Sequence, residues 1–327
     1  MSIKFNFFKA LAGDSILIST DRTNILIDGG YGITYEEQIQ PKLNRLKNCL
    51  DLVVLTHIDE DHICGLIEMI QNDRKNTNKI KEFWFNSIKS IRVRKNRNVP
   101  VSYGQAETFD ALLKEYDVPV NHEIFLTNSD NQKKYLINNE IELQLLSPYE
   151  SDLRILERKE PKNQNPTECL KNKARQVSTA FGSDNRPPNK SSIAFILKYD
   201  TKEFLFLADA NIEVINRSLE TLGYSENKLV VEFVKLSHHG SLENINEDFL
   251  KMIDTDKFII LTEGKPYNHP SKEIFPLIIK HQAKDKDIEF IFNYEGIKNR
   301  KLQEAKDNGV DLTRCSFKVL SRNFLEV

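Results

Sequence analysis

The stretch Thr56-His57-Ile58-Asp59-Glu60-Asp61-His62 decides the interpretation of this sequence. It directly follows an apolar run, residues 52–55, which is typical of a buried strand. Two imidazoles and two carboxylates with the spacing His-x-Asp-x-Asp-His are close together there, and buried carboxylates are costly unless they are paired or coordinated. A divalent cation stabilises such a cluster. The pattern therefore predicts a metal site at the end of a strand, in preference to a solvated polar loop.

The bulk properties limit the classes of protein that need to be considered. The chain has 327 residues, of which 39% are hydrophobic, and a net charge of −2, which is typical of a folded protein with a core. This charge balance does not indicate nucleic-acid binding, so a nucleic-acid partner would require a local basic patch. No apolar run is long enough to cross a bilayer. We expect no membrane association, no signal peptide, a cytoplasmic location and four reduced cysteines.

Strand and helix signals alternate along most of the chain. Apolar runs separated by tight turns predict strands before residue 150, and further strands follow residue 190. Between them, at about 150–190, lies a segment rich in Lys, Arg, Asn and Pro, which predicts an insertion loop. Because the strands fall into two groups with helices interspersed, we expect two sheets covered by helices in a single domain over residues 1–327.

Ligand-type residues follow four of the predicted strands. The runs at 52–55, 204–207, 233–236 and 258–261 each end in polar side chains, and five of the seven histidines lie at three of these ends. Open α/β sheets place their sites at the carboxyl ends of strands. Each residue alone has a simpler explanation: Asp209 as a helix cap, the pair His238-His239 as a polar turn, and His269 as a loop residue before Pro270. Their joint occurrence favours one site.

These pieces, in this order, resemble the metallo-β-lactamase fold, and most closely the hydrolase domain of the competence protein ComEC and its free-standing relatives. The resemblance spans roughly residues 3–275. The motif from His57 to His62 and the later motif Ser237-His238-His239-Gly240-Ser241 are its specific parts. The remaining matching segments are Gly13-Asp14-Ser15-Ile16-Leu17-Ile18, Ile25-Leu26-Ile27-Asp28-Gly29-Gly30, Gly65-Leu66, Leu207-Ala208-Asp209 and His269-Pro270, together with Leu55-Thr56 and Lys235-Leu236 directly before the two specific motifs.

The resemblance implies a four-layer αββα sandwich with a divalent metal site at the strand ends. Asp59 replaces the histidine that most of the superfamily has in the middle of the motif, and this harder ligand set suits Mn²⁺ or Mg²⁺ as well as Zn²⁺. No histidine precedes Asp209 at the usual place of a further ligand, where residues 189–192 stand instead. We therefore expect one or two ions. The implied metal ligands are His57, Asp59, Asp61, His62, Asp209 and His238.

If the preceding strand continues through the histidine pair, neighbouring side chains point to opposite faces. On this premise His238 is the metal ligand and His239 lies next to the metal or the substrate. The resemblance makes Asp61 the residue that orients or deprotonates a metal-bound water, while His239 or His269 stabilises the leaving group.

The expected function is metal-dependent hydrolysis, with a nuclease or another phosphodiesterase favoured by the resemblance. A nucleic acid or a small phosphodiester would then be the substrate, and the basic residues 89–97 either follow a phosphate backbone or form a solvated loop. Two alternatives stay open. One is hydrolysis of a small ester, lactone, thioester or nucleotide by the same metal core. The other is a non-catalytic, metal-stabilised subunit whose insertion loop docks a protein partner.

Overall fold

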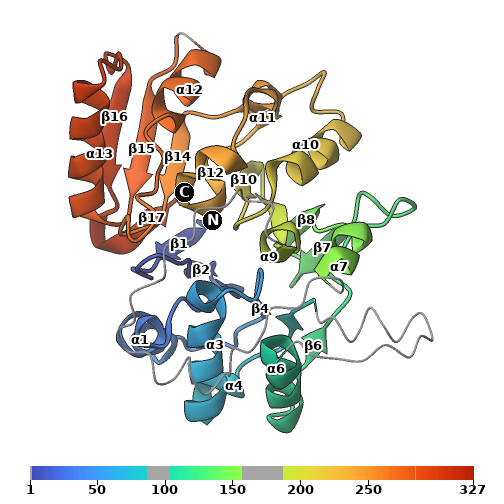
Figure 1. The fold of residues 1–327 in the computed structure, drawn as a ribbon. Helices are drawn as coiled ribbons and strands as arrows, with labels where there is room; N and C mark the ends of the chain where they lie inside the picture. Colours follow the sequence, from blue (N-terminus) through green and yellow to red (C-terminus); the bar gives the residue numbers. More distant parts are fainter. Residues whose placement is uncertain (1, 87–103, 157–186, 284) are drawn as a thin grey trace.

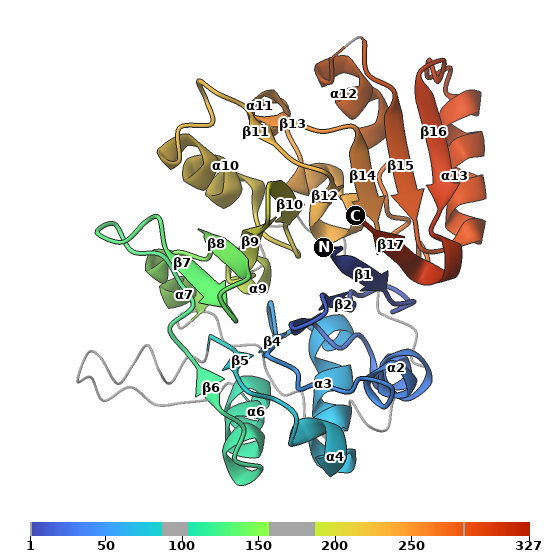
Figure 2. The same cartoon turned by 180° about the vertical axis from the view of Figure 1, so that it is seen from behind.

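The computed structural model describes residues 2–86, 104–156, 187–283 and 285–327. The basic stretch 89–97 and most of the predicted insertion lie outside the described residues. Within these ranges the chain forms two large sheets (Figures 1 and 2), and the N- and C-terminal strands pair with each other. No helix in the described ranges is long and apolar enough to span a bilayer.

The first sheet contains the strands before residue 122 and the last strand of the chain. Its order is β17 (Phe324–Glu326), β1 (Lys4–Phe7), β2 (Ile16–Ser19), β3 (Asn24–Ile27), β4 (Leu52–Val54), β5 (Phe83–Trp84) and β6 (Val120–Asn121). The pairs from β3 to β6 are parallel, with Ile27 opposite Val54 at the carboxyl end.

The second sheet contains the strands from residue 134 onward. Its order is β16 (Cys315–Val319), β15 (Ile288–Phe292), β14 (Lys257–Ile260), β12 (Val234–Lys235), β10 (Lys202–Phe206), β9 (Ala194–Tyr199), β8 (Ile141–Ser147) and β7 (Lys134–Ile137). Strands β10, β12, β14 and β15 run parallel, so their carboxyl ends meet at one edge. A small separate pair joins β11 (Leu229–Val230) to β13 (Ile253–Asp254).

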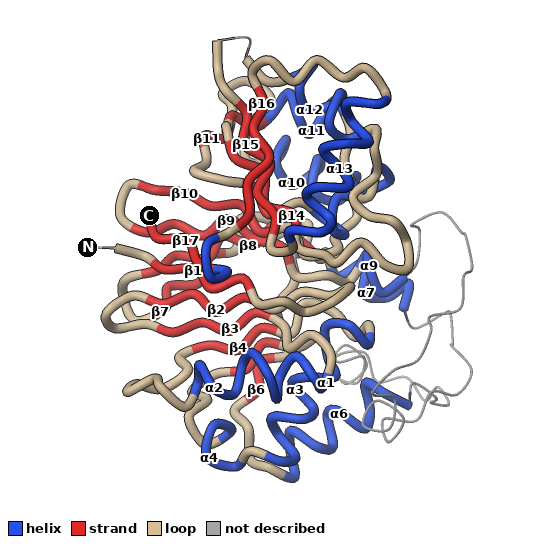
Figure 3. Tube along the Cα trace, turned by 90° about the vertical axis from the view of Figure 1, so that its left-hand side faces the viewer, coloured by secondary structure: helices blue, strands red, loops and turns tan. Residues whose placement is uncertain are grey.

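Helices cover the outer face of each sheet (Figure 3). On the first sheet these are α1 (Gly32–Thr34), the π-helical segment Tyr35–Ile39, α2 (Gln40–Leu43), α3 (Glu60–Asn72), α4 (Arg74–Thr77) and α6 (Gly104–Glu115). On the second sheet they are α10 (Ile212–Thr221), α11 (Glu247–Met252), α12 (Ile274–His281) and α13 (Glu295–Asp307). The short helices α7 (Glu150–Leu156) and α9 (Pro187–Lys190) flank the undescribed part of the insertion.

The central strands of both sheets are largely apolar, since both of their faces are buried. In β2, Ile16 and Ile18 pack into the core between the sheets, whereas Leu17 packs under the helices of the first sheet. In β10, Phe204 and Phe206 enter the same central core and Leu205 faces the helices of the second sheet. Successive side chains of a strand therefore alternate between the central core and the core under the helices. The expected αββα sandwich is confirmed.

Helix α3 begins at Glu60, inside the motif, so Asp61 and His62 lie in its first turn. Cys64 is disulfide-bonded, so the prediction of four reduced cysteines is wrong for this residue, while Cys49 and Cys315 are free. The position of His62 in the first turn of helix α3 directs its side chain back toward Asp28, at the end of β3.

A close approach of two glycines fixes helix α3 against the turn after β3. The Gly29 amide donates to the carbonyl of His62 over 2.8 Å, and the Gly65 amide donates to the carbonyl of Gly30 over 2.8 Å. A Cβ on Gly65 would lie 1.9 Å from the Gly29 carbonyl oxygen. Only glycine permits this contact, which holds the first turn of the helix beside Asp28.

We expect Gly65→Ala to lower the free energy of unfolding by about 3 kcal/mol, because backbone must move to admit the methyl group. Gly296→Ala is the matched control, since Gly296 is also helical and a Cβ there meets nothing within 4 Å. Helix propensity alone should make this control neutral or more stable by up to about 1 kcal/mol. Urea unfolding of the two variants measures the difference, and equal stabilities would contradict the packing argument.

Candidate metal centre

The motif directly follows strand β4 and lies at the edge where the two sheets meet. After β4 the chain passes through Thr56 and His57, both buried, and Asp59 stands immediately before helix α3. An aspartate at this position usually accepts a hydrogen bond from a helix amide. Here its side chain makes no cap, and its Oδ2 lies 3.7 Å from His57 Nε2. The geometry thus directs this carboxylate toward the imidazole.

Asp28, at the end of β3, orients both imidazoles of the motif. Its Oδ1 accepts from the Thr56 amide over 2.8 Å, and its Oδ2 accepts from the Thr56 hydroxyl over 2.7 Å. The same Oδ2 lies 2.8 Å from His62 Nδ1. The Thr56 hydroxyl in turn lies 3.1 Å from His57 Nδ1. With each Nδ1 engaged, the two Nε2 atoms are left to face the site, as in metal centres whose outer groups fix the histidine ligands.

The charge environment shifts the pKa values of the two motif imidazoles in opposite directions. Burial, followed by the neighbouring His62, holds the pKa of His57 well below its usual value. Burial would also lower the pKa of His62, but Asp28 and then Asp209 hold it well above its usual value. These surroundings favour the neutral form of His57 and the charged form of His62.

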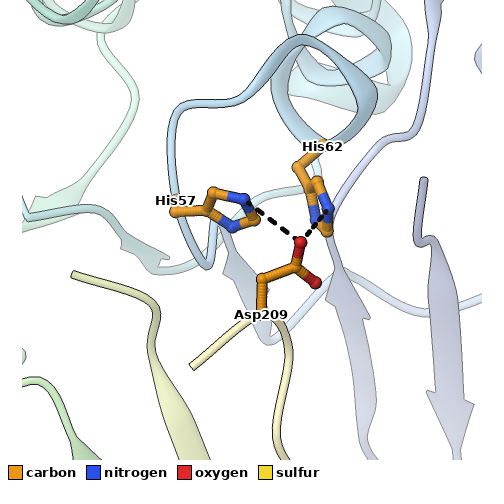
Figure 4. A group of neighbouring side chains, drawn as sticks. All are labelled: His57, His62 and Asp209. Atoms are coloured by element: carbon orange, nitrogen blue, oxygen red, sulfur yellow. Dashed lines mark ion pairs between the residues drawn. The ribbon is translucent and has the colours of Figure 1, made fainter. Parts of the chain in front are cut away.

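Strand β10 supplies the acidic centre of the cluster. Ala208 adopts a left-handed φ of 46°, which turns the buried side chain of Asp209 toward the first sheet. Figure 4 shows one carboxylate oxygen of Asp209 facing both motif imidazoles; Oδ2 lies 3.8 Å from His57 Nε2 and 3.7 Å from His62 Nε2. Asp209 thus links ligands that are about 150 residues away in sequence.

The histidine pair after β12 does not continue as a strand, so the premise of strand geometry, with neighbouring side chains on opposite faces, is wrong. Residues Ser237–Gly240 form a 3₁₀ turn in which His238 has φ 44° and His239 has φ 55°. Both imidazoles consequently enter the site. His238 Nε2 lies 3.8 Å from Asp209 Oδ2, and His239 forms a compact group of metal-ligand type with Asp61 and His62.

Fixed acceptors orient this second pair of imidazoles as well. His239 Nδ1 donates to the Leu261 carbonyl over 2.7 Å, and His238 Nδ1 lies 3.3 Å from Asn244 Oδ1. The Asn244 amide donates to the Ala210 carbonyl over 3.1 Å, which fixes its orientation. Sequence analysis missed Asn244, because a polar residue six positions after a histidine carries no recognisable signal.

The buried ligand-type atoms fit a metal ion. Four of them have no hydrogen-bond partner within the described part of the chain: the Nε2 atoms of His57, His62 and His239, and Oδ1 of Asp209. Buried polar atoms normally find partners, and imidazole nitrogens with carboxylate oxygens are the ligands of Zn²⁺ and related ions. Their convergence within a few ångströms provides a donor set for a divalent cation.

The remaining predicted residues lie at the margin of this cluster. His269 is half-buried, and its ring centroid lies 5.2 Å from that of His238. The region where the superfamily has a further histidine is next to the motif, because the Ile193 amide donates to the Thr56 carbonyl over 3.0 Å. Asn189 and Ser192 there are buried. The structure thus brings all seven predicted ligand and acid–base residues of the strand ends together, with His269 beside them.

A buried, oxygen- and imidazole-lined cluster at the seam of an αββα sandwich defines a metal-binding class of protein. A sequence model of the metallo-β-lactamase superfamily matches residues 9–119, which include the whole motif. This match and the order of the layers show that the chain has the metallo-β-lactamase fold. A comparison with curated protein sequences gave no match.

Solved structures with distant likeness include three of different kinds. YhfI from Bacillus subtilis is 12% identical, with 100% of this chain and 99% of that chain covered and a TM-score of 0.45. A diphosphatase from the PhnP family is 12% identical, with 100% and 98% covered and a TM-score of 0.46. The short form of human tRNase Z is 10% identical, with 100% and 98% covered and a TM-score of 0.43.

Asp28→Asn should weaken metal binding about 10- to 100-fold, because it removes the charge that orients His62 directly and His57 through Thr56. Thr56→Val is the matched partner variant, since it removes only the hydroxyl beside His57 and should have a smaller effect. Competition with a chromophoric chelator, titrated with Zn²⁺ or Mn²⁺, measures both affinities. Wild-type affinity in Asp28→Asn would show that the aspartate does not orient the ligands.

Proposed function

We propose that this protein is a metal-dependent hydrolase. The observation that carries the proposal is the convergence of buried, unpartnered ligand atoms from His57, His62, His239 and Asp209 within the described residues. A site built only for stability would not need half-exposed carboxylates beside it, yet Asp59 and Asp61 lie at its accessible side. Access from solvent is what a substrate and its attacking water require.

Two overlapping sets of residues are proposed to hold the ion or ions. His57, Asp59 and Asp209 form the first set, and Asp61, His62 and His239, joined to Asp209 through His62, form the second. His238 adjoins Asp209 and remains a candidate ligand. Because carboxylates contribute as many groups as imidazoles, Mn²⁺ suits the site as well as Zn²⁺. The absence of the further histidine leaves one or two ions as the expected content.

The chemistry then divides among the residues around the ion. A divalent cation held there would lower the pKa of a coordinated water toward neutrality and polarise the scissile bond. Asp61 is the residue that would orient the attacking water and accept its proton. His238 and His269 are the groups placed to donate a proton to the leaving oxygen, since their rings adjoin each other on the less buried side.

A phosphodiester is the proposed substrate class, as in a nuclease or another phosphodiesterase. Its support is the resemblance of the two specific motifs to the ComEC-like hydrolases. These enzymes also have an aspartate, in place of a histidine, at the position that corresponds to Asp59. The residues proposed to follow a nucleic-acid backbone (89–97) or to dock a protein partner lie outside the described residues. Hydrolysis of a small ester, lactone or nucleotide is the alternative, because the same metal core serves several substrates.

Purified protein should contain one or two equivalents of divalent metal by elemental analysis. With Mn²⁺ it should cleave single- or double-stranded DNA or RNA, or bis(p-nitrophenyl) phosphate, and Asp61→Ala should reduce the rate at least about 100-fold. Turnover of a small ester without any phosphodiester cleavage would favour the alternative hydrolase. Metal content without turnover of any substrate would favour a non-catalytic subunit.

Substitution of the two adjacent histidines should have different effects on metal content and on kcat. His239→Ala should lower the metal content, because it removes an imidazole from the group with Asp61 and His62. His238→Ala should retain more metal than His239→Ala and lower kcat, because its proton-donating role lies on the substrate side. Elemental analysis and steady-state kinetics of both variants distinguish the roles. The reverse order of metal loss would assign His238 as the principal ligand.

A further inference from the structure

A buried ion pair that the proposed mechanism does not use lies directly behind the metal ligands. Lys235 Nζ contacts Asp14 Oδ2, and the two residues are 1% and 2% exposed. Asp14 comes from the turn after β1, whereas Lys235 is the last residue of β12, so the pair joins the two sheets. A buried pair of this kind contributes little to stability compared with apolar residues of similar volume. Its position therefore indicates another role.

Asp14 faces the imidazole of His239. Its second oxygen, Oδ1, lies 3.5 Å from His239 Nδ1, which donates to the Leu261 carbonyl. The other oxygen of Asp14 is paired with the buried Lys235 ammonium, so the group acts as a carboxylate. A carboxylate behind an imidazole raises the basicity of the opposite nitrogen and fixes the ring. That opposite nitrogen, Nε2, is directed toward Asp61 and His62.

Lys235 also holds the turn that carries Asp209. Its Nζ lies 3.3 Å from the Ala208 carbonyl, which also accepts from the His238 amide over 2.9 Å. Ala208 has a left-handed φ of 46°, a conformation that residues with a Cβ adopt at a cost and that surrounding contacts must maintain. The lysine therefore supports the turn immediately before the bridging aspartate.

The turn of Gly13, Asp14 and Ser15 contacts segments of both sheets that contribute to the site. A Cβ on Gly13 would lie 1.8 Å from the Asp61 carbonyl oxygen, so only glycine fits against the motif backbone there. The Ser15 hydroxyl donates to the Asp28 carbonyl over 3.0 Å. A short loop thus touches the backbone of Asp61 and of Asp28 while its central carboxylate reaches His239 and Lys235.

We propose that Asp14 and Lys235 are positioning residues for the metal centre, Asp14 through His239 and Lys235 through the Ala208-Asp209 turn. This inference rests on the proposed metal-binding function. The pair sets the direction of two ligands from the second sheet relative to the motif of the first sheet. Its removal consequently weakens metal binding even where the fold is retained.

The test uses the apolar double variant Asp14→Leu/Lys235→Met in the full chain, together with Asp14→Asn. Because the double variant leaves neither charge unpaired, its metal-free Tm should stay close to that of the wild type. Its affinity for Zn²⁺, measured by chelator competition, should fall about 10- to 100-fold. Asp14→Asn keeps the shape of the side chain, and its affinity for Zn²⁺ should lie between those of the wild type and the double variant. Bound Co²⁺ should also show an altered visible absorption spectrum, because the geometry of its ligands changes.

Asp51→Asn is the matched control. Asp51 is likewise a buried carboxylate paired with a lysine, Lys81, but it lies at the opposite end of β4 from the motif. This variant should lose stability and keep wild-type affinity for Zn²⁺. Wild-type affinity and an unchanged Co²⁺ spectrum in the double variant would overturn the positioning role while leaving the metal site intact. Absence of both Zn²⁺ and Mn²⁺ binding by the wild type would overturn the proposed function itself.

Discussion

The carboxylate of Asp209 is the group on which the arrangement of the whole site depends. Burial alone would raise its pKa, but His238 and His62, followed by two further imidazoles, hold the pKa well below its usual value. A buried anion needs positive charge or a cation beside it. Because the imidazoles come from both sheets, the interaction that compensates this charge also links the two sheets at the candidate metal site. The apolar core packs the sheets together, and this cluster joins their strand ends.

Orientation of the imidazoles follows one rule throughout the site. Each ring has Nδ1 beside an oxygen that belongs to a rigid part of the fold, and this leaves Nε2 to face the interior. The oxygens come from a threonine hydroxyl, a carboxylate, an asparagine amide and a backbone carbonyl: Thr56 for His57, Asp28 for His62, Asn244 for His238 and Leu261 for His239. A donor set that is oriented before binding loses less conformational freedom when an ion arrives.

Local patterns predicted two sheets covered by helices and a cluster of ligand-type residues at strand ends, because both depend on short-range signals. The four-layer order and the set of metal ligands were implied by the resemblance. Strands such as β2 and β3 are recognisable as apolar runs between turns, and the ligand types cluster at strand ends. Strand β17 was not predicted, because its stability comes from pairing with β1 at the other end of the chain. The pairing of Lys235 with Asp14 was not predicted either: the two residues belong to separate matching motifs, and only the fold brings them face to face.

The direction of the ligands was the least predictable feature, and the reason lies in the backbone. Four non-glycine residues at the site adopt a positive φ: Asp28, Ala208, His238 and His239. Intrinsic preference disfavours this conformation, so it persists only where packing and hydrogen bonds impose it. Strand geometry would have turned one histidine of the pair away, whereas the left-handed turn brings both inward. At these strand ends the tertiary contacts overrule local propensity, and such departures are expected where a fold is shaped by its site.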